Sequence, residues 1–395
     1  MKLLHTGDLH IGKTVNDFSM LEDQKEILSQ ILLLAKENQV NGVILAGDIY
    51  DRAVPSGDAV LVFNDFLTAL AREGITVYMI SGNHDSPERI SYGEELLREQ
   101  GIMIAGVYHN EITVIHTKDA YGDVDILLLP FIKPSAEAAG TSEEAVAKAL
   151  GKYWEKEAAE RSKLPAGQNR QDTKRRILVT HFFVTDAGNE PLLSDSETTI
   201  HVGGIDNVDA SVFDGMDYVA LGHIHRPQQI GNRQVYYAGS PLSYSFSEAG
   251  QKKKVLLVEL KEKGNCQVTE LPLTPPREMR KLEGSMEELL RQGEEDQNRE
   301  DYVQAILTDQ KELVDPMGVL RSVYPNVMQV VRKETAGSLQ YTGEELKLKR
   351  RDPLTILEDF YGFVREEALT EEKKDKERLL AIAKASSSLP YVCPI

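Results

Sequence analysis

Aspartate, asparagine and histidine side chains recur where short apolar runs of this sequence end. Asp8 and His10 follow the run KLLHTG, and Asp48 follows GVILAG. Later runs end in GNHD, VTH and GHIH, which contribute Asn83, His84, Asp85, His181, His223 and His225. In an open α/β sheet the loops after the strands gather at one edge. Residues as distant in sequence as Asp8 and His225 can therefore converge.

This mixture of carboxylates, imidazoles and one amide suits a pair of divalent metal ions. Two neighbouring cations repel each other, and a carboxylate shared between them lowers that repulsion. Imidazole and amide groups complete the coordination shells without excess negative charge. Such a metal pair clamps a phosphodiester and generates hydroxide. Mixed nitrogen and oxygen ligands favour manganese, iron or zinc over magnesium, and we favour manganese on availability and ligand hardness.

Each of these motifs, taken alone, also has a purely structural explanation. A DxH or GD after a strand is usually a turn, GNH fits a turn, and GHIH fits an exposed strand end. A lone His181 would be an ordinary buried histidine. Their joint occurrence favours a functional site. The remaining histidines fit no motif, and we interpret them as structural: His5, His109, His116 and His201.

The apolar runs predict buried strands, because they are rich in valine, isoleucine and leucine and end in turn-forming or polar residues. Amphipathic stretches between the early runs predict helices over residues 21–38 and 58–73. Strands alternate with helices at first, and strand follows strand later. This order predicts the α/β class, with central sheets packed as a sandwich and flanked by helices.

The chain divides into three expected regions. An insertion at about 134–175 interrupts the first region, and its helix begins at a capping box of Thr141 and Glu144. The second region has the order strand, helix, strand, helix, strand, which indicates a small α+β domain. The third region is helical from Asp352 and Pro353 onward, with a flexible tail. The regions are residues 1–274, 275–345 and 346–395.

Composition limits the classes of protein. Hydrophobic residues at 41% and charged residues at 27% fit a globular chain rather than a disordered one. The net charge of −18 argues against tight DNA binding by this chain alone, but not against DNA as a substrate. The two cysteines suggest no disulfide framework, so we expect a reducing cytoplasm. We expect neither a signal peptide nor a membrane-spanning segment.

The motifs DLH, GDIYD, GNHD, VTH and GHIH, in this order, resemble the calcineurin-like metallophosphoesterase superfamily. The stretches ISGNHDSPERI and YAGSPLSYSFSE are similar to a bacterial DNA-nuclease branch of it. The resemblance implies a metallophosphoesterase β-sandwich, with residues 275–345 as a capping domain. It also implies that Asp48 bridges two metal ions. One ion would be held by Asp8, His10 and His225, and the other by Asn83, His181 and His223.

The resemblance implies catalytic residues as well. His84 would contact the scissile phosphate and help the leaving oxygen depart. Asp51 resembles the carboxylate that pairs with this histidine in the phosphatase branch, although some nucleases of the family have a histidine there instead. Arg52 and Arg89 could bind phosphate or DNA, or they could be ordinary surface arginines.

The nuclease branch implies exonuclease activity on duplex ends and endonuclease activity at hairpins or single strands, in DNA repair and recombination. It also implies a partner ATPase with a coiled coil, on which residues 346–395 would dock, and a homodimer within a heterotetramer. A phosphatase or cyclic-nucleotide phosphodiesterase could use the same metals. A non-catalytic DNA-tethering scaffold is a further alternative. A separate cap and a docking tail favour a polymer substrate, and the intact ligand set with His84 argues against a scaffold.

Overall fold

The computed structural model describes residues 1–163, 173–195, 206–311 and 313–333. Residues Met1–Lys333 form one compact unit. The helices expected within residues 346–395 lie outside the described residues. Within the described part of the chain, no helix is both long and apolar enough to cross a membrane.

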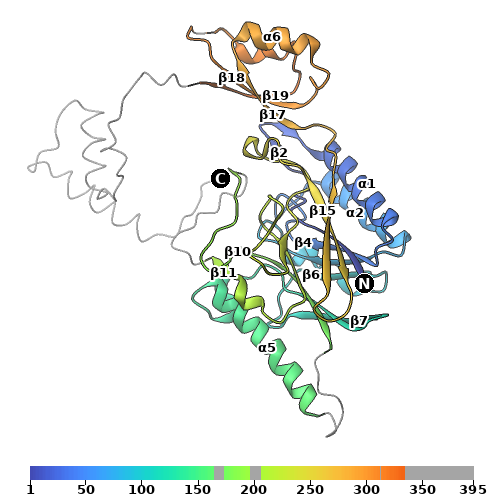
Figure 1. Ribbon diagram of the computed structural model, residues 1–395. Coiled ribbons are helices and arrows are strands. Elements are labelled where there is room, and N and C mark those ends of the chain that lie inside the picture. Colours follow the sequence, from blue (N-terminus) through green and yellow to red (C-terminus); the bar gives the residue numbers. More distant parts are fainter. Residues whose placement is uncertain (164–172, 196–205, 312, 334–395) are drawn as a thin grey trace, which may run out of the picture. The chain divides into compact units, whose positions relative to one another are not determined.

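The first six-stranded sheet contains the N-terminal strands and is extended by two later ones (Figure 1). Strands β1, β4, β5 and β6 lie side by side and run parallel. On the other side of β1, β15 and β16 continue the sheet in antiparallel pairing. In spatial order the strands are β16 (Cys266–Pro272), β15 (Lys254–Leu260), β1 (Lys2–Thr6), β4 (Gly42–Ala46), β5 (Thr76–Ile80) and β6 (Ile102–Ala105).

The second six-stranded sheet also has a parallel centre, in which β8, β9, β12 and β14 are neighbours. Antiparallel strands form its two edges. In spatial order its strands are β13 (Gln228–Gln229), β14 (Val235–Tyr237), β12 (Tyr218–Gly222), β9 (Arg175–His181), β8 (Gly122–Leu128) and β7 (Thr113–Asp119). Two small pairs complete this part of the chain: β2 (Thr14–Val15) with β3 (Phe18–Ser19), and β10 (Phe183–Thr185) with β11 (Asn207–Asp209).

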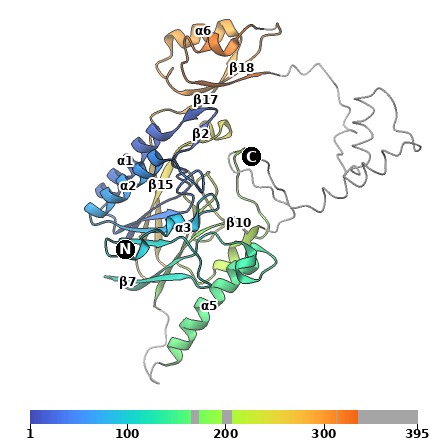
Figure 2. The ribbon, with the colours of Figure 1, turned by 180° about the vertical axis from the view of Figure 1, so that it is seen from behind.

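Helices cover the outer faces of the two sheets. Helices α1 and α2 pack on the first sheet, and α5 packs on the second (Figures 1 and 2). Ser56 caps α2 by accepting a hydrogen bond from the Ala59 amide. The α-helices of this part are α1 (Leu21–Glu37), α2 (Gly57–Arg72), α3 (Pro87–Ile90), α4 (Glu94–Arg98) and α5 (Ser142–Ser162). The described 3-10 turns are Pro134–Glu137, Ala210–Phe213 and Phe246–Glu248.

A layer of aliphatic side chains joins the inner faces of the two sheets. Ile44 of the first sheet belongs to the same buried cluster as Ile126, Val179 and Ala220 of the second. Every residue of β4 and of β12 is buried, because a sheet covers one face of each strand and helices or loops cover the other. This double burial explains the continuous apolar runs. The predicted α/β sandwich flanked by helices is confirmed.

The inserted helix forms where it was expected, but its capping differs in detail. The Thr141 hydroxyl accepts a hydrogen bond from the Glu144 amide. The Glu144 carboxylate accepts from the Gly140 amide, one residue before the cap, instead of closing a reciprocal box. The predicted capping box is therefore only half formed, because the chain enters the helix in an orientation that presents the Gly140 amide to the carboxylate.

Residues 279–332 form a three-stranded parallel sheet with helices in its connections, in the predicted order of elements. A full capping box at Ser285 and Glu288 starts the first helix. Next to this sheet, Arg277 forms an ion pair with the buried Asp23 at the start of α1. The elements are β17 (Met279–Gly284), α6 (Met286–Glu295), β18 (Tyr302–Leu307), α7 (Pro316–Leu320) and β19 (Val327–Arg332).

His5 links the two sheets in the middle of the sandwich. It lies in β1, is fully buried, and its Nδ1 atom is 2.8 Å from the hydroxyl of Tyr218 in β12. Burial lowers the pKa of His5 from 6.5 to about 3, because a charged ring would be poorly solvated there. His5 therefore has a structural role, in agreement with its place inside a strand.

We expect His5→Gln to make the protein less sensitive to acid. Below pH 6.5 the unfolded chain binds a proton that the folded His5 excludes, so stability present above this pH is lost as the pH falls towards 3. At pH 5 this loss amounts to about 2 kcal/mol. Urea unfolding at pH 7 and pH 5 measures it. The stability difference between the two proteins should shift by about that amount in favour of the variant, and an unchanged difference would contradict the burial argument.

Candidate metal and phosphoester site

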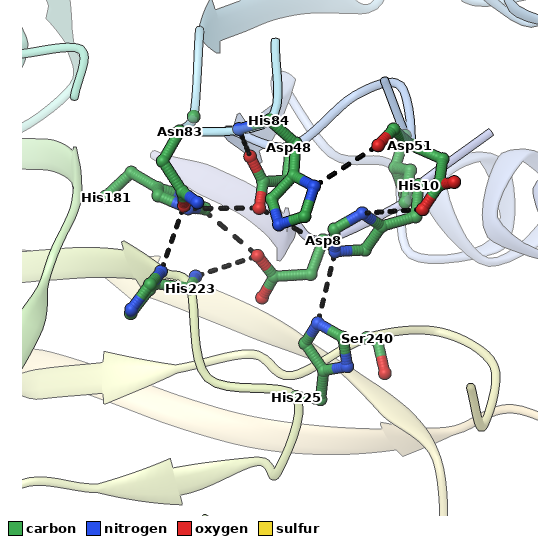
Figure 3. Close-up of polar contacts among 12 residues, drawn as sticks. Asp8, His10, Asp48, Asp51, Asn83, His84, His181, His223, His225 and Ser240 are labelled. Atoms are coloured by element: carbon green, nitrogen blue, oxygen red, sulfur yellow. Dashed lines mark hydrogen bonds and ion pairs between the residues drawn. The ribbon is translucent and has the colours of Figure 1, made fainter. Parts of the chain in front are cut away.

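The polar residues at the strand ends lie together where the two sheets meet (Figure 3). The loops after β1, β4 and β5 come from neighbouring parallel strands of the first sheet, and β9 and β12 are neighbours in the second. Their carboxyl ends therefore face the same side. The structure brings together all of the expected ligands: Asp8, His10, Asp48, Asn83, His181, His223 and His225.

Asp48 lies at the centre of this group. Its Oδ2 atom is 3.3 Å from Nε2 of His181 and 3.7 Å from Nε2 of His10. Its Oδ1 atom accepts a hydrogen bond of 2.9 Å from the His84 amide. Two sets of three residues each have potential ligand atoms within 4.8 Å of one another, and Asp48 belongs to both sets. One set adds His10 and His84, and the other adds Asp8 and His181. No other carboxylate in the described residues belongs to both sets.

On one side of Asp48, two histidine ring nitrogens lie close to the side-chain oxygen of Asn83. Its Oδ1 atom is 3.0 Å from Nε2 of His181 and 3.1 Å from Nδ1 of His223. The other ring nitrogen of His181 is 2.8 Å from the main-chain oxygen of Ala46, which can only accept. His181 therefore carries a proton on Nδ1 and directs Nε2 towards Asn83 and Asp48. This tautomer is the one that a metal ligand bound through Nε2 requires.

The donors on the other side are also close together. The Nε2 atoms of His10 and His225 are 3.1 Å apart. Asp8 lies between the two groups of histidines (Figure 3). Its Oδ1 atom accepts from the His223 amide at 2.7 Å, and its Oδ2 atom is buried with no hydrogen-bond partner among the described residues. A buried carboxylate oxygen without a partner is costly. A divalent cation would satisfy it, so the donor set fits metal binding.

Several donors are held in strained backbone conformations. Asp8, His10, Asp48 and His223 have φ angles of 51°, 44°, 49° and 101°. Side-chain-bearing residues rarely adopt positive φ, and such strain persists only where surrounding contacts impose it. Here the His10 amide donates to the main-chain oxygen of Asp48 at 2.9 Å, which ties the two loops together. The strain turns these side chains inward at the ends of their strands.

Burial and mutual charge set the protonation of the site. Burial raises the pKa of Asp8 to about 6, although His181 and His225 oppose this. Burial acts in the same direction on Asp48, but His181 and His10 outweigh it and hold the Asp48 pKa well below its usual range. Burial opposes a charge on His181, yet Asp48 and Asp8 raise its pKa to about 9. The imidazolium of His181 thus supplies positive charge that a metal would replace.

Asp85 supports two of the loops, a role that was not predicted from the sequence. Its buried carboxylate accepts hydrogen bonds from the amides of Ile49 and Tyr50, beside Asp48, and of Gly82, beside Asn83. It therefore holds the loops that carry Asp48 and Asn83 in register. The signal was present, because Asp85 is the last residue of the GNHD motif. Its partners in the preceding strand-end loop could not be recognised from the motif alone.

The pairing expected between Asp51 and His84 differs in the structure. The Asp51 carboxylate bonds to Lys13 Nζ at 2.6 Å, and Nδ1 of His10 is 3.8 Å from it. His84 Nδ1 contacts the main-chain oxygen of Asp51 instead, at 3.2 Å. The predicted contact between the Asp51 carboxylate and His84 is therefore wrong. Asp51 contacts His84 through its main-chain oxygen, because its carboxylate binds Lys13. Lys13 was not predicted as a site residue, although it lies just after the DLH motif.

The two candidate phosphate-binding arginines lie at the surface. Arg52 is 79% exposed in its side chain, and its Nε atom is 3.6 Å from Asp51. Arg89 is exposed in helix α3, which follows the GNHD loop. Both belong to segments that continue directly from the site loops.

Residues 1–227 match the family model of calcineurin-like phosphoesterases, and residues 275–364 match the model of the type 5 capsule protein repressor C-terminal domain, SbcD_C. The SbcD subunit of the nuclease SbcCD from Staphylococcus epidermidis is 31% identical over 380 residues, covering 95% of this chain and 96% of that protein. Its counterpart from Staphylococcus saprophyticus is 30% identical over 379 residues, with the same coverage of 95% and 96%. This chain belongs to the SbcD family.

Membership of the SbcD family identifies the chain as a metal-dependent hydrolase of phosphoester bonds, of the nuclease type. Among solved structures, that of TT1561 from Thermus thermophilus aligns at 16% identity with a TM-score of 0.36, covering 68% of this chain and 98% of that one.

Close packing of glycines at the site leads to a prediction for Gly222→Ala. A methyl group there would lie 1.9 Å from the Ala46 main-chain oxygen and 2.7 Å from Nδ1 of His181. It would break the hydrogen bond that orients His181. We expect a loss of about 1–3 kcal/mol in stability and metal binding weaker by about tenfold or more. Thermal unfolding and manganese titration measure both. The control is Gly151→Ala in α5, where the added methyl group meets open space. This variant should weaken neither stability nor metal binding.

Proposed function

We propose that this chain is the nuclease subunit of an SbcCD-type complex and hydrolyses DNA phosphodiester bonds with two metal ions. The position of Asp48 carries the proposal, because its carboxylate belongs to both groups of potential ligands. A shared carboxylate is what two neighbouring cations need. The names of the curated relatives, which mark them as subunits of the nuclease SbcCD, support DNA as the substrate.

The ligand assignment follows from the donors and from the family. Asp48 would bridge the two ions. One ion would be held by Asp8, His10 and His225, and the other by Asn83, His181 and His223. Distances alone do not divide the donors this way, because Asp8 also lies with His181. The mixed nitrogen and oxygen set favours manganese. When bound, the ions would polarise the phosphodiester and lower the pKa of the attacking water.

His84 is the residue that would act on the leaving group. Its ring is exposed, and its Nδ1 atom lies 3.2 Å from the main-chain oxygen of Asp51, which can only accept. Nδ1 therefore donates, and Nε2 is the atom available to the substrate. From there a protonated ring can donate to the leaving 3′-oxygen. General acid help of this kind accelerates a reaction by roughly 10²–10⁴-fold.

Three basic side chains supply positive charge around the site. Lys13 is bound to Asp51 and is 18% exposed in its side chain. Arg52 and Arg89 are exposed on the adjoining segments and would contact DNA phosphates. The chain as a whole carries a net charge of −18, so tight DNA binding needs basic surface from a partner.

The partner we propose is an SbcC-like coiled-coil ATPase, with two copies of each chain in the complex. Residues 1–274 would be the nuclease domain, residues 275–345 the capping domain that helps to present DNA, and residues 346–395 the segment that docks on SbcC. In this complex the chain would act as an exonuclease on duplex ends and as an endonuclease on hairpins or single strands.

One set of assays tests the proposal. The chain is incubated with manganese, with and without SbcC and ATP, on linear duplex DNA, hairpin DNA and a small chromogenic phosphodiester. We expect cutting of both DNA forms, stimulation by SbcC and ATP, and loss of activity on chelation. Efficient hydrolysis of the small phosphodiester with intact DNA in every mixture would instead identify a small-molecule phosphodiesterase.

Asp48→Asn should lose metal at both positions. Removing this charge deprives each ion of its shared ligand and leaves the surrounding histidines without their central carboxylate. Metal analysis of the folded variant by mass spectrometry measures the effect, with the wild type as reference. Retention of two full equivalents would remove Asp48 from the bridging position.

His84→Gln should separate catalysis from metal binding. Glutamine cannot donate a proton as an acid, so we expect cleavage to fall by roughly 10²-fold or more, with near-normal metal content and DNA affinity. All three quantities are measured on one preparation. His84 lies within 4.8 Å of ligand atoms of His10 and Asp48, so loss of metal would make it a ligand instead. Normal cleavage would exclude it from the mechanism.

A further inference from the structure

We propose that Glu248 is a positioning residue for His225, and that Lys253 holds Glu248 in place. Together they would keep the His225 ring in the tautomer and orientation that present Nε2 to a metal. This inference rests on the proposed function, because it concerns one of the proposed ligands. Glu248 and Lys253 lie outside every motif to which a ligand or catalytic role was assigned.

Glu248 divides its two oxygens between different partners. Its Oε1 atom is 3.5 Å from Nδ1 of His225 and 3.3 Å from the Tyr244 amide. Its Oε2 atom accepts from Lys253 Nζ at 2.5 Å and from the Ser240 hydroxyl at 3.4 Å. Glu248 is completely buried. A carboxylate in this position can only accept, so it favours a proton on Nδ1 of His225 and leaves the lone pair on Nε2.

The Nε2 atom of His225 points towards the other donors. It is 3.1 Å from Nε2 of His10, and Asp8 lies beside both rings (Figure 3). A ring with its proton on Nε2 could not bind a metal there. The tautomer that Glu248 favours is therefore the one that His225 needs as a ligand. In proteins, a metal-bound histidine usually donates its second ring proton to a carboxylate or carbonyl group in this way.

Lys253 fixes the main chain of His225 as well as its carboxylate partner. Its Nζ atom donates to the His225 main-chain oxygen at 3.4 Å and to the Ser240 hydroxyl at 3.0 Å. The Ser240 amide donates to the same main-chain oxygen at 3.1 Å. The side chain of Lys253 is only 1% exposed, so its charge and that of Glu248 balance each other in the interior. Ring and backbone of His225 are thus held by one network.

A second buried ion pair, which lies away from the proposed ligands, provides a control for the pair beside His225. Glu157 pairs with Arg176 at 2.9 Å, and their side chains are 9% and 1% exposed. This pair joins α5 to the start of β9, at the opposite end of that strand from His181. It therefore supplies a matched control: loss of a buried pair at this position should affect stability alone.

The test removes the pair without leaving a buried charge. In Glu248→Met with Lys253→Met, two apolar side chains of similar volume replace the ions, an exchange that is often neutral for stability. We expect the second equivalent of manganese to bind roughly 10- to 100-fold more weakly. The electron paramagnetic resonance signal of coupled manganese should give way to that of isolated manganese. Glu157→Met with Arg176→Met should keep both equivalents and the coupled signal.

A variant that keeps the acceptor distinguishes positioning from packing. In Glu248→Gln with Lys253→Met, the amide oxygen can still accept from Nδ1 of His225, so we expect metal binding between wild type and the double-methionine variant. Wild-type affinity and coupling in the double-methionine protein would overturn the inference. So would equal weakening of both equivalents in that protein and in the Glu157 control, which would mark a general loss of structure.

A measurement on the wild type covers the case in which these variants do not fold. In zinc-loaded protein with labelled histidine, the Nδ1 proton of His225 should resonate far downfield and exchange slowly, because a buried carboxylate accepts it. Fast exchange of this proton would overturn the inference. If the wild type binds two equivalents of metal and the double-methionine variant binds them equally tightly, Glu248 does not position His225. If the wild type binds fewer than two, the two-metal proposal itself fails.

Discussion

This structure depends on one constraint. Charged and polar side chains of the site are buried close together, and each of them needs a partner there. Asp8 and Asp48 are buried within a ring of histidines, and each group is tolerable only because the others are present. His181 supplies charge that keeps Asp48 ionised. Such an arrangement costs free energy unless every member is compensated. The surrounding fold is therefore built to hold the members at fixed distances.

The sandwich meets this demand by bringing strand ends together. Parallel pairing aligns the carboxyl ends of β1, β4 and β5, and the second sheet adds the ends of β9 and β12. Short main-chain contacts then tie loop to loop, such as the His10 amide to Asp48. Strands fix the points at which the site loops begin, and these contacts limit how far the loops can move. The strained conformations at Asp8 and His223 are maintained by this scaffold.

The strands and the meeting of the ligands could be predicted from sequence, because both follow local rules. An apolar run followed by GD or GNH reads as a buried strand with a polar end, and parallel neighbours bring such ends together. The atom by which Asp51 contacts His84 could not be predicted, since it depends on competition from Lys13. The role of Asp85 was missed for a similar reason: its partners belong to another loop, and only packing brings them within reach.

The order of the strands has a consequence for synthesis on the ribosome. β1 emerges first, yet one of its two neighbours is β15, near residue 254, and His181, His223 and His225 belong to the second half of the sandwich. A nascent chain that has emerged only as far as α5 carries Asp8, Asp48 and Asn83 but none of these three histidines. The donor set is completed only when the second sheet exists. If this set binds metal as proposed, metal capture would be delayed until most of the chain has been made.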